Sequence, residues 1–255
     1  SQGRAILEET VKRQPKDWKA KYYLGNYMFE HALKDAAVKL WKDAAAINNS
    51  YSVIHRNLGL VAWKMDNNYW QASMHYEKAI SCNPNDLSLY RDLATIYVDH
   101  MQQYGRAKDM LEKMREKSVR ADVVSLLART YNFLGEYDKA IALLAADNYS
   151  NWEGRGSLYN IYIDAHVGKG EQLFNKGDYE GALKEFRVST DYPNNLGPGI
   201  MEDPEIAKSR YWGGLTLEKM GKKEEAIKEW KIAAAEAERG SEENKKFGLL
   251  AKNKI

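Results

Sequence analysis

The sequence contains little proline, a single cysteine and no long apolar run. Five prolines in 255 residues, with no alternating Val/Ile/Thr stretches, argue against a β-sandwich or barrel. Apolar runs such as "AIALLAA" (140–146) span only a few residues and are too short to cross a bilayer. Cys82 has no second cysteine to pair with, so an internal disulfide is excluded. We therefore expect a reducing compartment, the cytoplasm.

An excess of charge of one sign is also lacking. The chain has 38 basic and 36 acidic residues, a net charge of +2, and no dense basic block. Nucleic acid is therefore not an expected partner, and neither is a membrane. Alanine, lysine, glutamate, leucine and tyrosine are abundant instead, a composition that suits helices packed through small and aromatic side chains.

The residue patterns typical of catalytic sites are missing as well. None of the five histidines has a second histidine four residues away or a cysteine at ligand spacing, so no metal site is expected. No phosphate-binding glycine loop occurs, and the pair Glu224 and Glu225 lies among lysines, as on a solvated helix face. The sequence predicts a protein that is not an enzyme and needs no cofactor.

A repeated pattern is what the sequence does contain. "LGEYDKAIALL" (134–144) returns as "KGDYEGALKEF" (176–186) and as "MGKKEEAIKEW" (220–230). A small residue marks each of six repeats at intervals of 34, 35, 34, 42 and 44 residues, the spacing of helix–turn–helix repeats. These anchor residues are Gly25, Gly59, Ala94, Ala128, Gly170 and Gly214.

Each repeat carries two further marked positions on its expected second helix. A second small residue is followed four positions later by a large apolar residue. Two antiparallel helices approach closely where a small side chain faces the partner, and the large residue fills the adjoining space. The small residues are Ala37, Ala72, Ala107, Ala140, Ala182 and Ala226, and the large ones are Trp41, Tyr76, Leu111, Leu144, Phe186 and Trp230.

On these residues the chain resembles the tetratricopeptide repeat family, from about residue 18 to residue 237. The resemblance implies an all-α fold, a right-handed α-α superhelix or solenoid of about six helix–turn–helix repeats. The expected ranges are a trailing second helix (1–16), repeats one to four (17–144), an insert loop (145–157), repeat five with an extended first helix (158–192), a second insert loop (193–202), repeat six (203–238), and a polar cap or tail (239–255).

The first segment raises the question of what precedes it. "GRAILEETVKRQP" (3–15) has the spacing of a second helix with its closing proline, and no first helix stands before it. We therefore interpret the chain as part of a longer protein, and a bacterial one.

The family resemblance also places a binding groove. Its first helices line the concave surface, and a small set of their positions faces a peptide or protein partner. Arginines on neighbouring helices could pair with a carboxylate there, and aromatic rings could stack on an apolar group. The implied groove residues are Tyr22, Asn26, Phe29, Arg56, Leu60, Trp63, Arg91, Thr95, Arg129, Asn132 and Phe133.

Some family members clamp the carboxyl terminus of a chaperone with two asparagines and several basic residues. Asn26 and Asn57 match the two asparagine positions, whereas Tyr22, Ser88 and Asp92 occupy positions where basic residues belong. The clamp is therefore broken, and chaperone-tail binding is not predicted.

Two functions remain open. The first is a non-catalytic scaffold that binds a peptide or protein in the concave groove. The second is an accessory carboxyl-terminal region of a larger bacterial carbohydrate-associated or enzyme-like protein, whose amino-terminal part would then be a partner. The aromatic insert with Tyr149, Trp152, Tyr159 and Tyr162 motivates this alternative. Weak self-association through an uncapped end of the repeat array is a further possibility.

Overall fold

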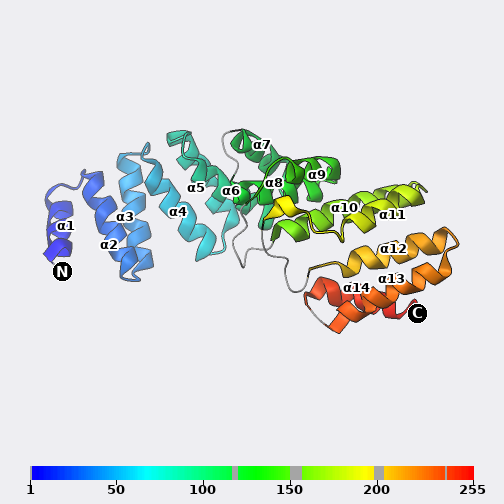
Figure 1. Ribbon diagram of the computed structural model, residues 1–255. Coiled ribbons are helices and arrows are strands. Elements are labelled where there is room, and N and C mark those ends of the chain that lie inside the picture. The colour runs from blue at the N-terminus through cyan, green and yellow to red at the C-terminus, as the bar shows by residue number, and fades with distance from the viewer. Residues whose placement is uncertain (1, 117–119, 150–156, 198–203, 239) are drawn as a thin grey trace. The chain divides into compact units, whose positions relative to one another are not determined.

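A computed structural model describes residues 2–116, 120–149, 157–197, 204–238 and 240–255, and these residues are helical with short connections (Figure 1). They divide into two compact units, unit 1 (Ser1–Met114) and unit 2 (Arg115–Ile255). The expected all-α fold of helix–turn–helix repeats is confirmed. The helices are α1 (Gln2–Arg13), α2 (Trp18–Glu30), α3 (Lys34–Ile47), α4 (Ser52–Lys64), α5 (Tyr69–Cys82), α6 (Leu87–Asp99), α7 (Tyr104–Arg115), α8 (Ala121–Phe133), α9 (Tyr137–Ala145), α10 (Ser157–Asn175), α11 (Tyr179–Val188), α12 (Ala207–Lys219), α13 (Lys223–Ala235) and α14 (Glu242–Lys252), with 3-10 turns η1 (Asn194–Leu196) and η2 (Glu236–Glu238).

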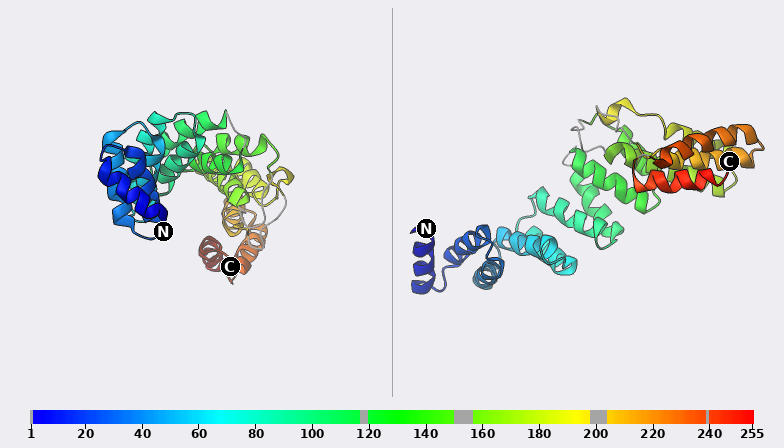
Figure 2. Two further views of the ribbon diagram at one scale, coloured as in Figure 1. Left: turned by 90° about the vertical axis from the view of Figure 1, so that its left-hand side faces the viewer. Right: turned by 90° about the horizontal axis from the view of Figure 1, so that it is seen from below.

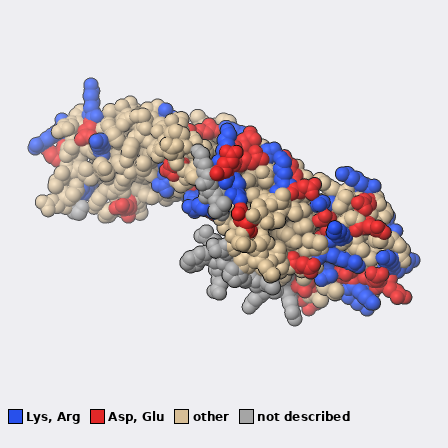
Figure 3. Space-filling view, turned by 45° about the horizontal axis from the view of Figure 1, so that its top comes forward, with Lys and Arg blue, Asp and Glu red and all other residues tan. Residues whose placement is uncertain are grey.

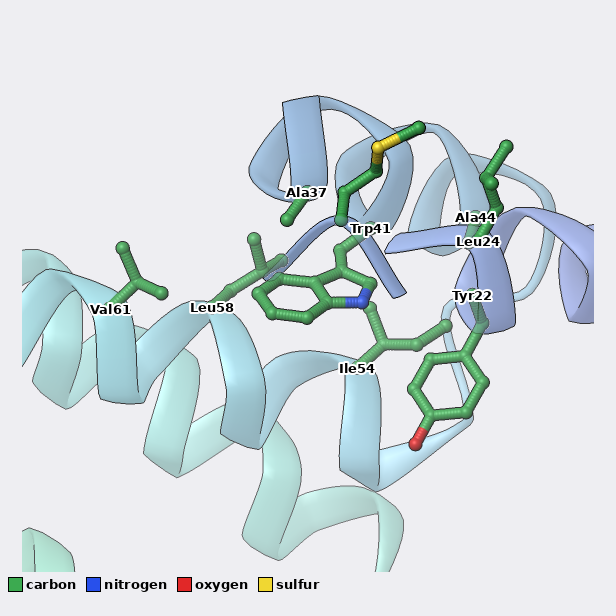
Figure 4. Packing of buried hydrophobic residues seen from close by; sticks show 9 residues of the cluster. Tyr22, Leu24, Ala37, Trp41, Ala44, Ile54, Leu58 and Val61 are labelled. Atoms are coloured by element: carbon green, nitrogen blue, oxygen red, sulfur yellow. The ribbon is translucent and has the colours of Figure 1, made fainter. Parts of the chain in front are cut away.

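The repeated small and large residues form the core of both units. All six second-helix alanines have no exposed surface, and the six large residues are at most 3% exposed. In the first repeat the Trp41 indole lies beside Ala37 and against Ile54 and Leu58 of α4 (Figure 4). The large residue of one helix pair therefore packs against the first helix of the next pair, as the spacing predicts.

The glycine anchors face the large residue of their own repeat. A Cβ atom built on Gly25 would lie 2.6 Å from Trp41 Nε1, and one on Gly214 would lie 2.3 Å from Trp230 Nε1. A Cβ on Gly170 would similarly lie 2.4 Å from the Phe186 ring. Real Cβ atoms do not approach other atoms so closely, so these glycines set the distance between the paired helices.

The turns within the helix pairs use the left-handed backbone conformation. Gly135, Gly177 and Gly221 have φ angles of 71°, 82° and 79°, as expected for residues that end a helix. Asn67 fills the same role in the second repeat, with φ 51°. Ala32 also adopts a positive φ, 59°, although alanine disfavours that region.

The two segments that interrupt the repeat in unit 2 bind to each other. The Asn195 side-chain Nδ2 donates hydrogen bonds to the carbonyl oxygens of Leu144 (2.7 Å) and Asp147 (2.9 Å). The backbone carbonyl of Asn195 accepts a hydrogen bond from Tyr149 N (2.8 Å). Leu196 is fully buried beside them. Residues 150–156 and 198–203, among them Trp152 of the aromatic insert, lie outside the described part of the chain.

The polar carboxyl-terminal segment forms helix α14, which packs on α12 and α13 (Figure 2). Asn244 is fully buried, accepts a hydrogen bond from Ala207 N (3.1 Å) and donates one to Pro204 O (2.9 Å). Lys208, also buried, pairs with Asp164 of α10. The segment therefore caps the last helix pair of unit 2.

Two neighbouring glycines of α12 test the role of the anchors. Gly214→Ala forces a Cβ against Trp230 and should destabilise the protein by about 1–3 kcal/mol. Gly213→Ala meets nothing within 4 Å and should stabilise it by up to about 1 kcal/mol through helix propensity. Urea and thermal unfolding midpoints of the two variants should therefore move in opposite directions. Equal shifts would refute the role of close approach.

The histidine pair of unit 1 should make the free energy of unfolding depend on pH. The rings of His55 and His75 are stacked with centroids 6.1 Å apart, and burial lowers the pKa of His75 to about 4. An unfolded histidine titrates near pH 6.5, so the unfolded chain binds protons first as the pH falls. Stability should drop between pH 6.5 and 4, by on the order of 2–3 kcal/mol from this group.

His75→Gln should remove most of this drop in urea unfolding measured at several pH values. Met74→Gln, at the neighbouring exposed position on α5, is the matched control and should keep the wild-type pH dependence. A wild-type profile in His75→Gln would contradict the assignment.

Candidate functional site

A pocket of about 250 Å³ opens in unit 1 between α2 and α4. Five of the eleven groove residues expected from the sequence line it, and Trp41 of α3 contributes to its wall. We call it the asparagine pocket, and its lining residues are Tyr22, Asn26, Phe29, Glu30, Trp41, Val53, Arg56, Asn57 and Leu60. The structure thus brings together predicted residues that lie about thirty positions apart in the sequence.

A hydrogen-bond network fixes the two asparagines of this pocket. Trp41 Nε1 donates to Asn26 Oδ1 at 3.0 Å, and Asn57 Nδ2 donates to the same oxygen at 3.3 Å. An indole N–H is a donor only, so the atom that faces it must be the oxygen of Asn26. The nitrogen of Asn57 then has to face that oxygen. Both side-chain orientations therefore follow from the position of Trp41.

The network leaves the amide nitrogen of Asn26 and the amide oxygen of Asn57 without partners among the described residues. The two side chains share one bond and line the same pocket. The pocket therefore offers a hydrogen-bond donor and an acceptor side by side, the complement of a peptide group.

Apolar side chains form the rest of the pocket wall. The Phe29 ring lies 5.4 Å from the Trp41 ring, and Val53 and Leu60 contribute from α4. Tyr22 is 8% exposed and packs edge-on against Tyr51 with centroids 5.3 Å apart. Tyr22 therefore contributes its ring to the apolar wall of the pocket. In a chaperone clamp a cation would occupy this position.

Two charged side chains of opposite sign belong to the pocket. Arg56 of α4 and Glu30 of α2 are both exposed. Neither makes an ion pair with another described residue. On the face shown in Figure 3 basic and acidic side chains are intermingled, and neither sign forms one large uniform patch. The pocket can therefore offer a ligand one positive and one negative group.

Three expected groove residues of unit 1 lie outside the pocket. Trp63 is 8% exposed and packs edge-on against Tyr76, with ring centroids 6.3 Å apart, so it serves packing. Arg91 binds Asp92 Oδ1 through Nη2 at 2.8 Å, and Thr95 donates its hydroxyl to Arg91 O at 2.9 Å. These side chains are engaged within the protein.

The positions that break the chaperone clamp also have structural roles. Asp92 accepts a hydrogen bond from the Tyr76 hydroxyl at 3.2 Å, and burial raises the pKa of Tyr76 far above its usual value. That hydroxyl therefore stays protonated and donates to Asp92. Ser88 donates its hydroxyl to Asp86, the residue that caps α6, at 2.6 Å.

The remaining three predicted residues belong to unit 2. Asn132 donates to Ile161 O at 3.0 Å, which joins α8 to α10, and its buried Oδ1 has no partner among the described residues. The Arg129 guanidinium lies 6.0 Å from the centre of the Phe133 ring, which is 53% exposed. None of these three residues lines the asparagine pocket, which belongs to unit 1.

The repeat pattern assigns Trp41 to the core and not to the groove, because large residues at its position pack between helix pairs. It does pack the core, and its indole N–H also orients Asn26. The available signal was the pairing of Trp41 with an asparagine next to the Gly25 anchor. In the sixth repeat the equivalent Trp230 donates to a backbone carbonyl, Tyr211 O, at 3.2 Å, because Leu215 follows the Gly214 anchor there.

Neither a metal centre nor a membrane span is present in the described part of the chain. No group of three or more His, Cys, Asp or Glu residues there is arranged to hold a metal ion. No helix among the described residues combines the length and the apolar character needed to cross a bilayer.

Comparison with known proteins agrees with this architecture. A family model described as a tetratricopeptide repeat matches residues 75–109, from α5 through α6 into α7. A chain in the structure of Naa15/Naa10 bound to HypK-THB is 19% identical, with a TM-score of 0.60 over 97% of this chain. This chain spans 35% of that one, about a third of its length.

Two smaller proteins have the same fold over most of their own length. YrrB, described as a TPR protein with an unusual peptide-binding site, is 21% identical, with a TM-score of 0.52 over 84% of this chain and 97% of its own. MamA is 20% identical, with a TM-score of 0.51 over 72% of this chain and 90% of its own.

The fold and the pocket define a protein built of stacked helix–turn–helix repeats that presents a small hollow between its first helices. Residues 75–109 match the tetratricopeptide repeat model, and the fold is that of YrrB, a TPR protein.

Trp41→Phe tests how the asparagine pocket is held. The variant keeps an aromatic core residue and loses the donor to Asn26, so the side-chain amide resonances of Asn26 and Asn57 should shift in ¹⁵N–¹H spectra. Trp230→Phe makes the same change in the sixth repeat and should leave those resonances in place. Both variants should lose on the order of 1–2 kcal/mol of stability. Unshifted amide signals in Trp41→Phe would show that the indole does not orient the pair.

Proposed function

We propose that the chain is a non-catalytic protein-interaction scaffold, and that the asparagine pocket binds an extended peptide segment of a partner protein. The observation that carries this proposal is the unpartnered donor and acceptor of Asn26 and Asn57 beside an apolar hollow. A peptide group presents one N–H and one C=O, which these two atoms complement.

The size and lining of the pocket suit a peptide better than a reacting substrate. A volume of about 250 Å³ accommodates one large side chain, with Phe29, Val53 and Leu60 as its apolar surroundings. Side-chain burial would supply most of the affinity, and the asparagines would orient the main chain. The pocket's titratable side chains, Arg56, Glu30 and Tyr22, form no pair within hydrogen-bond reach, as a nucleophile and its base would.

Proteins of the same fold support a role in protein interaction. YrrB has a peptide-binding site, and the Naa15/Naa10 structure is a complex with HypK-THB. The match to Naa15/Naa10 covers a third of that chain, so partners of such longer proteins enter only as proposals here. An accessory region of a larger carbohydrate-associated or enzyme-like protein could use the same pocket to hold another part of its own chain.

The proposed setting is the cytoplasm. The chain's one cysteine, Cys82, suits a reducing compartment, where an unpaired thiol is stable.

Selection from a phage library of random twelve-residue peptides tests the proposal. Peptides enriched on the wild-type chain should bind the double variant Asn26→Ala/Asn57→Ala at least about tenfold more weakly, because two main-chain hydrogen bonds are lost. Asn175→Ala is the matched control, since Asn175 is an exposed asparagine at the end of α10 in unit 2. Its affinity should equal that of the wild type.

Affinities measured by fluorescence polarisation with synthetic peptides decide the outcome. Peptides that bind the double variant Asn26→Ala/Asn57→Ala as tightly as the wild type would place the binding surface elsewhere and overturn the proposal. Circular dichroism of each variant checks that the fold is retained.

A further inference from the structure

Arg56 is one of the two charged residues of the pocket, and its role is not explained by packing. It is exposed and forms no ion pair with any other described residue. Other arginines of unit 1 are paired, for example Arg91 with Asp92 at 2.8 Å and Arg106 with Glu77 at 2.6 Å. The guanidinium of Arg56 is therefore available to a ligand, for which it can form two parallel hydrogen bonds to a carboxylate.

The position of Arg56 restricts where such a carboxylate can lie. Arg56 directly precedes Asn57 on α4, and Leu60 follows one helical turn later on the same side. A peptide whose main chain is bonded to Asn57 Oδ1 would thus place its apolar side chain against Leu60 and an adjacent side chain near Arg56. The two contacts come from neighbouring residues of the ligand.

Glu30 restricts the ligand at the opposite wall. It belongs to α2, is exposed, and makes no ion pair within the described residues. A second carboxylate on that side of the ligand would be repelled, whereas a neutral or basic residue would be tolerated. The pocket therefore disfavours a run of acidic residues.

This inference rests on the proposed function, that the asparagine pocket binds a peptide. We propose that the pocket selects an internal segment with one apolar residue. On one side of that residue the segment has a single acidic residue that pairs with Arg56, and on the other side it has a neutral or basic residue. The free carboxyl terminus of a chain is not required, since Tyr22, Ser88 and Asp92 stand where a terminal-carboxylate clamp needs cations.

The peptides selected from the random library supply the test. Aligned on their common apolar residue, the wild-type binders should be enriched in Asp or Glu on one side and should lack acidic residues on the other. In a synthetic consensus peptide, replacement of that acid by its amide should weaken binding to the wild type by about 3- to 10-fold. The same replacement should change binding to Arg56→Gln by less than about twofold, since the interacting partner is gone.

Glu30→Gln tests the second charged side chain of the pocket, which is also exposed and makes no ion pair with a described residue. It should retain the full preference for the acid over the amide and should tolerate a second acid on its own side. Arg56 is exposed, so Arg56→Gln should unfold at the wild-type temperature and remain a valid test.

Each outcome is decisive. An acid preference that disappears in Arg56→Gln supports the proposal. Peptides that depend on Asn26 and Asn57 but show no acid preference, or one that survives in Arg56→Gln, overturn it and leave peptide binding by the pocket intact. Failure to enrich any peptide that depends on the two asparagines overturns both the proposed function and the inference.

Discussion

The contact between a residue without a side chain and a large ring is the constraint on which the glycine-anchored repeats depend. Gly25, Gly170 and Gly214 allow a Trp or Phe ring to approach the backbone of the preceding helix at distances that any Cβ would block. The ring also packs against the first helix of the next pair, as Trp41 does on Ile54 and Leu58. One contact thus sets both the spacing inside a pair and the stacking between pairs.

In unit 1 the same contact also builds the candidate site. Because Gly25 admits the Trp41 ring, the indole N–H reaches the side chain of the next residue, Asn26. The carboxamide of Asn26 is then fixed, and with it that of Asn57 on α4. A polar pair that would be free to rotate on an open surface is held in one orientation at the pocket that both residues line. Such preorganisation lowers the entropy cost of binding.

The fold could be predicted from the sequence because its contacts recur. Spacings of small and large residues identified the six alanines and six large residues that the structure buries, and the turn glycines adopt the expected positive φ. The site was only partly predictable, because its contacts occur once. Helical position selects the five predicted residues that line the pocket. It also selects Arg91 and Trp63, which it cannot distinguish from them. In the structure Arg91 pairs with its neighbour Asp92, and Trp63 packs on Tyr76. Asn195 of η1 binds the 144–149 segment in a contact that occurs once, and no repeated spacing in the sequence predicts it.

The most direct measurement is a crystal structure of the chain with a peptide obtained from the selection. We expect an extended peptide over the asparagine pocket, its main-chain carbonyl bonded to Asn26 Nδ2 and its N–H to Asn57 Oδ1, with the Trp41–Asn26 bond unchanged from the free protein. A peptide seated on the second helices, or a rotated Asn26 side chain that accepts nothing from Trp41, would contradict this expectation.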